Sequence, residues 1–549
     1  MLYSKDMENN SSELIKQIFD LKTENKKLRK ENEELRKANS KLSLENKKIK
    51  VLEDKCKNLE DNIETMIADK VQKAINMTTQ NLTEHYESII RKLNNKISKL
   101  EKTLNTDSSN SSLPSSKNRI GKKVIPNTRE KSNNSIGGQI GHKVHKLDYF
   151  KDDEITETIE HTLDKCPNCN GELIEINTVK SDIIDFEIKI KKIRNNIHNY
   201  KCKNCHKNVS ANNELPRGAS YGNNVNALAL SLLNDSNVSY NKVVKHIYGI
   251  SNGEIDLTEG YLVKLQKKSA SNLDNFIQDL KRKILTLSKV HWDDTVVKIQ
   301  ADTENKNGKK IKEGYIRFYG DDSFALLIGH KKKDKESITK DGILPYLSED
   351  CTCIHDHVLL NYNEEYKFKN AECNSHILRY LKGVKDNLHD HIWQDKMSDL
   401  LREMNNKRDE YISTKVKSFT NEEIESYYKK YEEIINLGYE ENSKTKEYHF
   451  YKEDEKNLIE RLDKYKDNHL LFIKDFTVPF TNNTAERGLR QTKRKLAVSF
   501  LFKNTSTMED YAKIISYLET SYRNGITKFE ALRRLVSNNP YTVEEIGMV

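Results

Sequence analysis

The sequence predicts a multidomain α+β protein with an N-terminal coiled coil, a zinc ribbon, a helical domain and an α/β domain that contains an all-α insertion. Three observations predict this class: a seven-residue repeat near the N-terminus, two Cys-x-x-Cys pairs, and strand-like segments followed by a long helical stretch. The chain has 549 residues, 35% hydrophobic and 32% charged, so it is too long for one small module and too polar for a single compact globule.

Composition also limits the classes of function. No segment approaches the roughly 18 to 20 apolar residues of a membrane span, and the N-terminus lacks the apolar core of a signal peptide. We therefore expect an intracellular protein without a membrane partner. The net charge of +9 is compatible with an anionic partner. In a reducing compartment, the eight cysteines of the chain are expected to be metal ligands or buried thiols.

Residues 1–104 are predicted to form a coiled coil with a leucine zipper. Two core positions repeat every seven residues, occupied by Leu21, Leu28, Leu35, Leu42 and Ile49 and by Asn25, Asn32, Asn39 and Asn46. Buried asparagines at one core position favour a parallel, in-register dimer. The alternative is a single solvated helix, and a weaker helical pattern continues to about residue 104.

Residues 105–150 are expected to form a basic flexible linker, because they are rich in Ser, Asn and Gly. Between Lys117 and Lys146 they carry eight Lys or Arg and one acid. This density predicts either contacts with DNA phosphates or a merely soluble tether.

Residues 151–215 are predicted to form a zinc ribbon. Two Cys-x-x-Cys pairs, separated by 32 residues, offer four thiolates to one structural zinc ion: Cys166, Cys169, Cys202 and Cys205. The alternation in residues 183–193 predicts a strand between the pairs. A redox function is the weaker alternative. His206, which follows the fourth cysteine, is expected to be a bystander.

Residues 216–285 are predicted to be helical. Ser239 and Thr258 are expected helix caps, and a break is expected near residues 249–253. A helix-turn-helix that binds DNA and an ordinary helical packing both fit this pattern.

Residues 286–368 and 476–525 are predicted to form the two parts of an α/β domain that carries three carboxylates. Asp293 lies in a predicted strand, Asp356 follows another, and Glu486 lies in the first turn of a helix capped by Asn482 or Asn483. Such carboxylates could hold a pair of Mg²⁺ (or Mn²⁺) ions for phosphodiester chemistry. Asp321 and Asp322 compete for the second position, although they are predicted to lie in a hairpin turn.

Residues 369–475 are predicted to be an all-α insertion, because the 129 residues between Asp356 and Glu486 are too many for a direct connection. Thr420 and Glu423 are predicted to form a capping box. Cys351, Cys353, Cys373 and His376 are interpreted as buried thiols and a structural histidine, with a second metal site as the alternative. Residues 526–549 are expected to be a C-terminal tail.

A basic cluster follows Glu486. It comprises Arg487, Arg490, Lys493, Arg494 and Lys495. A solvated charged face is the usual explanation for such a cluster. This cluster, however, begins beside the proposed metal ligand Glu486, where the phosphate backbone of a DNA substrate would have to lie. We therefore predict DNA contact, chiefly through the first four of these residues.

The ordered set of motifs resembles the insertion sequence 66 family of DDE transposases over nearly the whole chain. The motifs are the zipper, NSSLPSSK, GGQIGHKVHKL, the paired Cys-x-x-Cys, HWDDT, IHDH, ECNSHILRYL and NNTAERGLR. The resemblance implies a ribonuclease H-like catalytic domain whose acidic triad is Asp293, Asp356 and Glu486. Two departures are Asp294, where the family usually has Glu, and His357, where it often has Gly.

The resemblance implies a transposase that binds the terminal repeats of its element, cleaves phosphodiester bonds and joins the 3′ hydroxyls to target DNA. Mg²⁺ would serve catalysis, zinc would be structural, and the zipper would pair two or more protomers. The expected location is the bacterial cytoplasm, at the nucleoid, and participation of small accessory proteins is left open. The alternatives are an inactive or co-opted DNA-binding regulator, and a nuclease that cleaves without joining.

Overall fold

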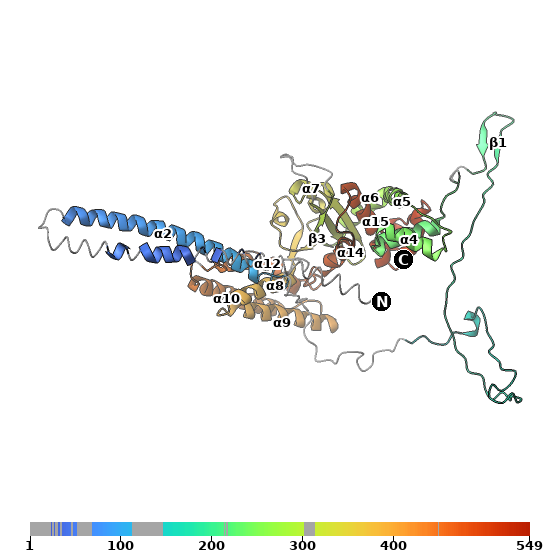
Figure 1. Ribbon diagram of the computed structural model, residues 1–549, viewed down its shortest axis with the longest axis horizontal. Coiled ribbons are helices and arrows are strands. Elements are labelled where there is room, and N and C mark those ends of the chain that lie inside the picture. Colours follow the sequence, from blue (N-terminus) through green and yellow to red (C-terminus); the bar gives the residue numbers. More distant parts are fainter. Residues whose placement is uncertain are drawn as a thin grey trace. The chain divides into compact units, whose positions relative to one another are not determined.

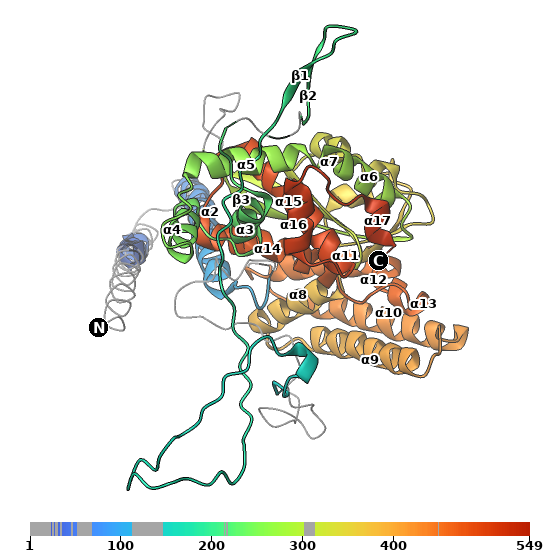
Figure 2. The same cartoon turned by 90° about the vertical axis from the view of Figure 1, so that its right-hand side faces the viewer.

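The computed structural model describes residues 68–111, 146–212, 215, 218–300, 313–447 and 449–548, together with residues 24, 27, 31, 32, 34, 36–45 and 48–51. It divides into two units, each built from separate segments of the chain (Figures 1 and 2). One unit comprises residues 1–126 and 371–481, and the other comprises residues 127–370 and 482–549. We call them the stalk unit and the sheet unit.

The sheet unit contains a mixed sheet with strand order β5-β4-β3-β6-β7. Its strands are β3 (Lys289–Lys298), β4 (Glu313–Gly320), β5 (Ala325–His330), β6 (Thr352–His355) and β7 (Lys369–Glu372). β3, β4 and β5 form an antiparallel meander, and β6 pairs in parallel with β3. The predicted strands around the two aspartates are therefore present, and the topology is consistent with a ribonuclease H-like core.

Helices from both ends of the sheet unit share one hydrophobic core with the sheet. They are α3 (Asn223–Leu230), the π-helical turn η3 (Ser231–Asp235), α4 (Tyr240–Ile250), α5 (Glu259–Ser271), α6 (Asp274–Leu285), α7 (Lys335–Asp341), η4 (Leu344–Tyr346), η5 (Leu359–Tyr362), α14 (Asn483–Ser499), α15 (Thr505–Arg523), α16 (Lys528–Val536) and α17 (Val543–Gly547). The C-terminal segment is no tail, because Leu532, Leu535 and Ile546 are completely buried in that core.

The predicted helices of residues 216–285 are present, but their arrangement differs from a helix-turn-helix. Residues 251–258 connect α4 to α5, which is longer than the three- to four-residue turn of that motif. The Thr258 hydroxyl accepts a hydrogen bond from the amide of Tyr261, as a helix cap should. Ser239 occupies the N-cap position of α4 without a capping side-chain hydrogen bond. These helices contribute to the shared hydrophobic core of the sheet unit and do not form a separate domain.

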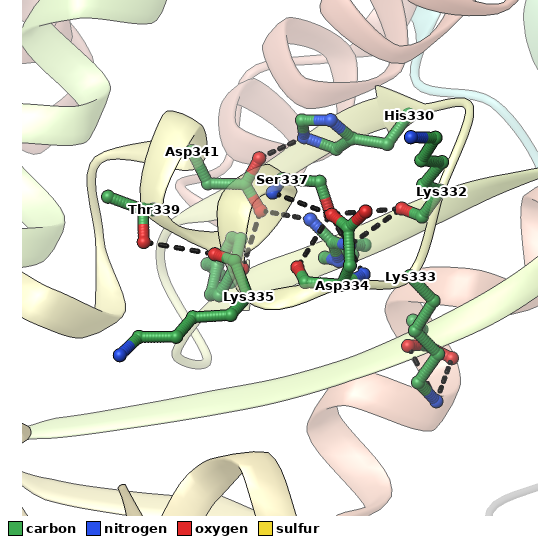
Figure 3. Close-up of polar contacts among 11 residues, drawn as sticks. His330, Lys332, Lys333, Asp334, Lys335, Ser337, Thr339 and Asp341 are labelled. Atoms are coloured by element: carbon green, nitrogen blue, oxygen red, sulfur yellow. Dashed lines mark hydrogen bonds and ion pairs between the residues drawn. The ribbon is translucent and has the colours of Figure 1, made fainter. Parts of the chain in front are cut away.

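A buried polar network fastens α7 to the meander (Figure 3). Arg317 on β4 contacts Asp341 at 2.8 Å, and neither side chain is exposed. Asp341 also accepts a hydrogen bond from the Tyr319 hydroxyl at 2.7 Å and pairs with His330. A second guanidinium nitrogen of Arg317 donates to the Ser337 hydroxyl at 2.7 Å. The network thus joins β4, β5 and α7, and its central pair, Arg317 and Asp341, has no access to water.

The outer edge of β5 is covered by α15. The amide of Leu327 donates to the Ser516 hydroxyl at 2.7 Å, and the amide of Ala325 donates to the Thr520 hydroxyl at 3.1 Å. Both hydroxyls are buried. Amide groups that an edge strand would otherwise leave without a partner are therefore satisfied by side chains of one helix.

The stalk unit combines a long helix with the predicted helical insertion. The helices are α2 (Ala68–Asn105), α8 (Asn374–Asn387), α9 (Trp393–Ser413), α10 (Asn421–Lys444), α11 (Lys452–Lys464), α12 (Lys466–His469) and α13 (Leu471–Lys474). Thr420 and Glu423 form the expected capping box of α10. Five of the nine zipper positions, Leu21, Asn25, Leu28, Leu35 and Asn46, lie outside the described residues, whereas residues 36–45 are helical. The Tyr86 hydroxyl donates a hydrogen bond to the Glu45 carboxylate.

The base of α2 is packed on the insertion. The Asn110 amide donates to Asp386 of α8 at 3.0 Å, and Lys102 pairs with Asp454 at 2.5 Å. A Cβ atom at Gly383 would lie 2.5 Å from the Asn110 carbonyl oxygen, so a side chain at this position would displace the turn. Residues 108–110 are buried. The first residues of the expected linker are therefore packed, and residues 112–145 lie outside the described residues.

The segment of the expected zinc ribbon has little regular structure. It contains η2 (Asp152–Glu154) and a hairpin of β1 (Asn199–Lys201) and β2 (Asn208–Ser210). Residues 183–193 form no strand, contrary to the prediction. In the part of the chain that the structure describes, no helix has the length and apolar character needed to cross a membrane.

Candidate active site

Two aspartates lie at matching positions on neighbouring parallel strands. The parallel register pairs His291 of β3 with Ile354 of β6. Two residues further along each strand are Asp293 and Asp356, and paired parallel strands lie about 4.8 Å apart. Asp293 and Asp356 therefore occupy adjacent positions, one within β3 and the other immediately after β6.

The electrostatics of Asp293 reflect this proximity. The side chain is half-buried, and its burial raises its pKa well above the ordinary value of a carboxyl group. The charges of Asp356 and Asp294 raise this pKa further, while the Asp294 amide, which donates to Asp293 Oδ1 at 2.7 Å, lowers it. Carboxylates that repel one another at close range favour a bound cation, so the donor set suits a hard divalent ion.

Helix α14, which carries Glu486, packs against the face of the sheet to which Asp293 belongs. Directly opposite residues of paired strands share a face, and Asp293 lies opposite Phe318 of β4. A Cβ atom at Gly488 would lie 2.4 Å from the Phe318 ring, so glycine is what allows α14 to approach this face closely. Glu486, two residues earlier, is half-buried. The three predicted carboxylates thus come from β3, the end of β6 and α14 of one unit.

A buried asparagine ties α14 to β3. The Asn482 amide donates to the Trp292 carbonyl at 2.9 Å, and its Oδ1 lies 2.8 Å from Nδ1 of His291. Since Oδ1 can only accept, His291 Nδ1 donates. Burial lowers the pKa of His291, which favours this neutral form. Asn482 was predicted to cap α14, but it occupies the N-cap position without a capping hydrogen bond and instead positions the helix of Glu486 beside Asp293.

Asp294 belongs to the opposite face. It lies opposite Arg317 in the register and pairs with Lys333 at 2.8 Å. Neighbouring residues on a strand point to opposite faces, so Asp293 faces α14 while Asp294 faces the segment that leads to α7. Asp294 is therefore separated from the candidate metal site by the strand itself.

Asp321 and Asp322 form the predicted turn between β4 and β5. Asp321 accepts hydrogen bonds from the amides of Ser323 and Phe324, at 2.8 and 2.7 Å, which stabilises the turn. Asp322 pairs with Arg487 at 3.2 Å and has a side chain that is 81% exposed. Asp321 thus has a structural function, and Asp322 is a surface neighbour of α14.

The predicted basic cluster covers the surface of α14 unevenly. Arg487, Arg490, Lys493 and Arg494 are exposed. Lys495 instead donates to the Leu233 carbonyl at 3.2 Å, and burial lowers its pKa to about 8. Lys495 therefore stabilises the contact with η3, and the four other cations remain at the surface.

Each Cys-x-x-Cys pair forms a closed turn. The amide of Asn170 donates to the Cys166 carbonyl at 2.8 Å, and the amide of His206 donates to the Cys202 carbonyl at 3.0 Å. Asn170 and His206 have φ of 60° and 56°, so His206 is a turn residue. Amide groups that donate to the sulfurs lower the pKa of Cys166 and Cys202. Each turn thus favours thiolates, as zinc ligation requires.

The two pairs are not brought together. Among the described residues, no group of three or more potential ligands includes Cys166, Cys169, Cys202 or Cys205. Apolar side chains between the pairs are exposed, such as Ile176 at 94% and Phe186 at 80%.

The other cysteines of the sheet unit are buried thiols. Cys351 and Cys353 are completely buried, which raises the pKa of Cys351 to about 11 and that of Cys353 well above its ordinary value. Cys373 and His376, in the stalk unit, are buried as well. For Cys351 and Cys353 these environments favour the interpretation as buried thiols. For Cys373 and His376 it stays a prediction, because both belong to a group of potential metal ligands.

Comparison with known families gives the chain its identity. Residues 219–510 match the family model described as Transposase IS66 family, and this range includes all three candidate carboxylates. No curated protein and no solved structure matches the chain. DDE transposases bind DNA and use divalent metal ions for phosphoryl transfer. Since the match covers more than half of the chain, the protein belongs to the IS66 family of DDE transposases and is an enzyme of DNA transposition.

Proposed function

We propose that Asp293, Asp356 and Glu486 are the catalytic triad and hold two Mg²⁺ (or Mn²⁺) ions. The observation that carries this proposal is the register of β3 with β6, which sets the two aspartates side by side. The Asn482 hydrogen bonds, which tie the start of α14 to β3, support the inclusion of Glu486. Bound metal would activate the attacking oxygen and stabilise the leaving oxygen. The chain's own contribution is to place the carboxylates and to hold DNA beside them.

The proposed reaction has two stages that use the same three carboxylates. Water attacks the phosphodiester bond at the element's end and releases a 3′ hydroxyl, which then attacks a phosphodiester of the target DNA. Neither stage needs a covalent enzyme intermediate. Arg487, Arg490, Lys493 and Arg494 would contact the phosphate backbone, because they continue along the helix that carries Glu486.

A strand-transfer assay tests this function. Purified protein is incubated with duplexes carrying a candidate element end, a target plasmid and Mg²⁺ or Mn²⁺. Joined products support the proposal. Cleaved but never joined DNA would favour a nuclease, and binding without either reaction would favour a co-opted regulator.

We further propose that Cys166, Cys169, Cys202 and Cys205 together bind one structural zinc ion per chain. Binding of this ion would draw the two Cys-x-x-Cys turns together. Metal analysis of the purified protein should find one zinc per chain, and Cys202→Ser should release it. Residues 172–198 should then become highly sensitive to protease, because structural zinc supplies most of the stability of such a small module. His206→Ala is the control and should retain zinc. Folded, DNA-binding protein without zinc would refute this prediction.

The leucine zipper is proposed to pair two protomers in parallel, so that two DNA ends can be held together. Changing the four asparagines at 25, 32, 39 and 46 to isoleucine should raise the melting temperature of the zipper and allow oligomers other than dimers. Thermal melting followed by circular dichroism measures the first change, and analytical ultracentrifugation of the full chain measures the second. A wild-type chain that sediments as a monomer at high concentration would contradict the prediction. The matched control replaces exposed Lys37 and Lys41 with arginine.

A further inference from the structure

The C-terminal end of α14 contains a strained turn. Phe500 has φ 62° and ψ −37°, and the amide of Leu501 donates to the Ser499 carbonyl at 2.7 Å. A three-residue turn with positive φ at its centre is rare and strained, and a bulky aromatic residue is especially unfavourable there. The side chain of Phe500 therefore makes this backbone conformation energetically unfavourable.

The backbone on each side enforces this strain. The Phe500 amide donates to the Leu496 carbonyl at 2.8 Å and closes the helix. Two residues later, the Phe502 amide donates to the Lys298 carbonyl at 2.9 Å, which fixes the chain to the end of β3. The Phe502 ring is buried, whereas the Phe500 ring is 75% exposed. Packing within the protein thus gives Phe500 little that offsets its strain.

The surroundings of Phe500 point to its ligand. Val498 and Leu501 are also exposed, at 50% and 42%, so three exposed apolar residues lie close together in the sequence at the end of α14, which we call the apolar tip. Arg487, Arg490 and Arg494 precede this tip at spacings of three and four residues, which places them along one face of the helix with Val498. Glu486 is the only acid of α14. A basic stripe that ends in an apolar tip is complementary to a phosphate backbone beside stacked bases.

We propose that Phe500 inserts as a wedge between base pairs of the DNA that the stripe binds. The inference rests on the proposed function, in which α14 contacts DNA. Phe500 lies 14 residues beyond Glu486, which is about 21 Å along a helix. With α14 parallel to the duplex axis, and at about 3.4 Å per base pair, the wedge enters about six base pairs from the scissile phosphate. Apolar side chains inserted in this manner unstack a base step and bend the duplex.

Fluorescence of 2-aminopurine tests the wedge in the full-length protein. The base is placed at one position at a time in a duplex carrying a candidate element end. Wild-type protein should raise the fluorescence most at about six base pairs from the cleaved phosphate. Phe500→Ala should abolish this maximum and weaken DNA binding roughly tenfold. Phe500→Trp should preserve the position of the unstacked step.

A stability measurement separates this function from a structural one. Phe500→Gly should have a melting temperature equal to or above that of wild type, because glycine adopts positive φ without strain, yet it should lose the fluorescence maximum. Phe529→Ala, at an exposed aromatic on α16, should change neither property. A clear loss of thermal stability in Phe500→Gly would show that the ring supports the fold and would overturn the proposal.

The remaining outcomes distinguish the wedge function of Phe500 from DNA binding by the basic stripe of α14. If Phe500→Ala keeps the fluorescence maximum while Arg490→Ala loses affinity, the wedge proposal is wrong and the proposed DNA binding by the basic stripe is supported. If both variants bind DNA like wild type, the proposed DNA binding by the stripe is wrong as well. A changed oligomeric state of Phe500→Ala without DNA would identify the tip as a protein interface and would also overturn the wedge.

Discussion

Alanine at Asp293, Asp356 or Glu486 should each abolish strand cleavage and joining while leaving binding to element ends largely intact. Catalysis needs the carboxylates to bind the metal pair, whereas DNA affinity depends mainly on exposed cations such as Arg490. Strand cleavage and strand transfer should fall below detection in each variant. A gel-shift titration measures the retained affinity on the same DNA.

The chain offers matched controls for this prediction. Asp294→Ala removes the adjacent carboxylate, but Asp294 lies on the opposite face and pairs with Lys333, so catalysis should persist. Arg490→Ala should show the reverse pattern from the triad, with weaker binding and a shallower dependence of affinity on salt. Full strand transfer by the Asp356 variant, with loss in an Asp321 or Asp322 variant, would place the second metal ligand in the turn.

Thermal unfolding gives a readout of the metal site that is independent of turnover. Mn²⁺ should raise the melting temperature of the wild-type protein, because an ion that binds only the folded state stabilises it. Asp293→Asn should lose this metal-dependent increase. Without metal, the same variant should be at least as stable as wild type, because it removes the repulsion between Asp293 and Asp356. A metal-dependent increase that survives in Asp293→Asn would exclude Asp293 as a ligand.

Arg317→Met should destabilise the sheet unit by about 3–5 kcal/mol, the usual cost of leaving one partner of a buried ion pair without the other. The side chains of Arg317 and Asp341 are fully buried. Without the guanidinium, the Asp341 carboxylate would retain only Tyr319 and His330. Chemical denaturation measures the change, with tryptophan fluorescence from Trp292 of the sheet unit and Trp393 of the stalk unit, both buried, as the signal.

The same helix supplies the control for that prediction. Lys340 and Glu336 of α7 pair at 2.7 Å, with side chains that are 67% and 72% exposed. Lys340→Met should cost less than about 1 kcal/mol, because water solvates both charges once they are separated. In the double variant Arg317→Met/Asp341→Leu, much of the lost stability should return. Equal losses from the buried and the exposed pair would show that the network contributes little to the fold.

The sequence predicted the strands and the helix that carry the three carboxylates, because the signals of these elements are local. The strands that carry Asp293 and precede Asp356 contain clusters of apolar residues, and the helix of Glu486 begins directly after Thr481 and Asn482. Asn482 occupies the predicted N-cap position, but its side chain bonds to His291 and the Trp292 carbonyl, which are about 190 residues away in the chain. A local rule for helix caps cannot detect such a contact.

Other differences between the predicted and the observed elements arose where a local sequence pattern needed a packing or hydrogen-bonding partner elsewhere in the chain. Residues 183–193 alternate like a strand, yet a strand forms only with a neighbouring strand that accepts its hydrogen bonds. Residues 526–549 were assigned to a tail, although Leu532 and Leu535 at a spacing of three are an apolar helical signal. Attention to that spacing would have found α16.

The cover that α15 places on β5 affects the order in which the protein can fold during synthesis. β5 leaves the ribosome well before Ser516 and Thr520, which satisfy its outer amides. In the interval, nearly 190 residues of chain are made while the meander still exposes a strand edge to other nascent chains. A message truncated before α15 would leave that edge open permanently. Such fragments would therefore be prone to aggregation and to capture by chaperones, and only a completed chain would yield soluble enzyme.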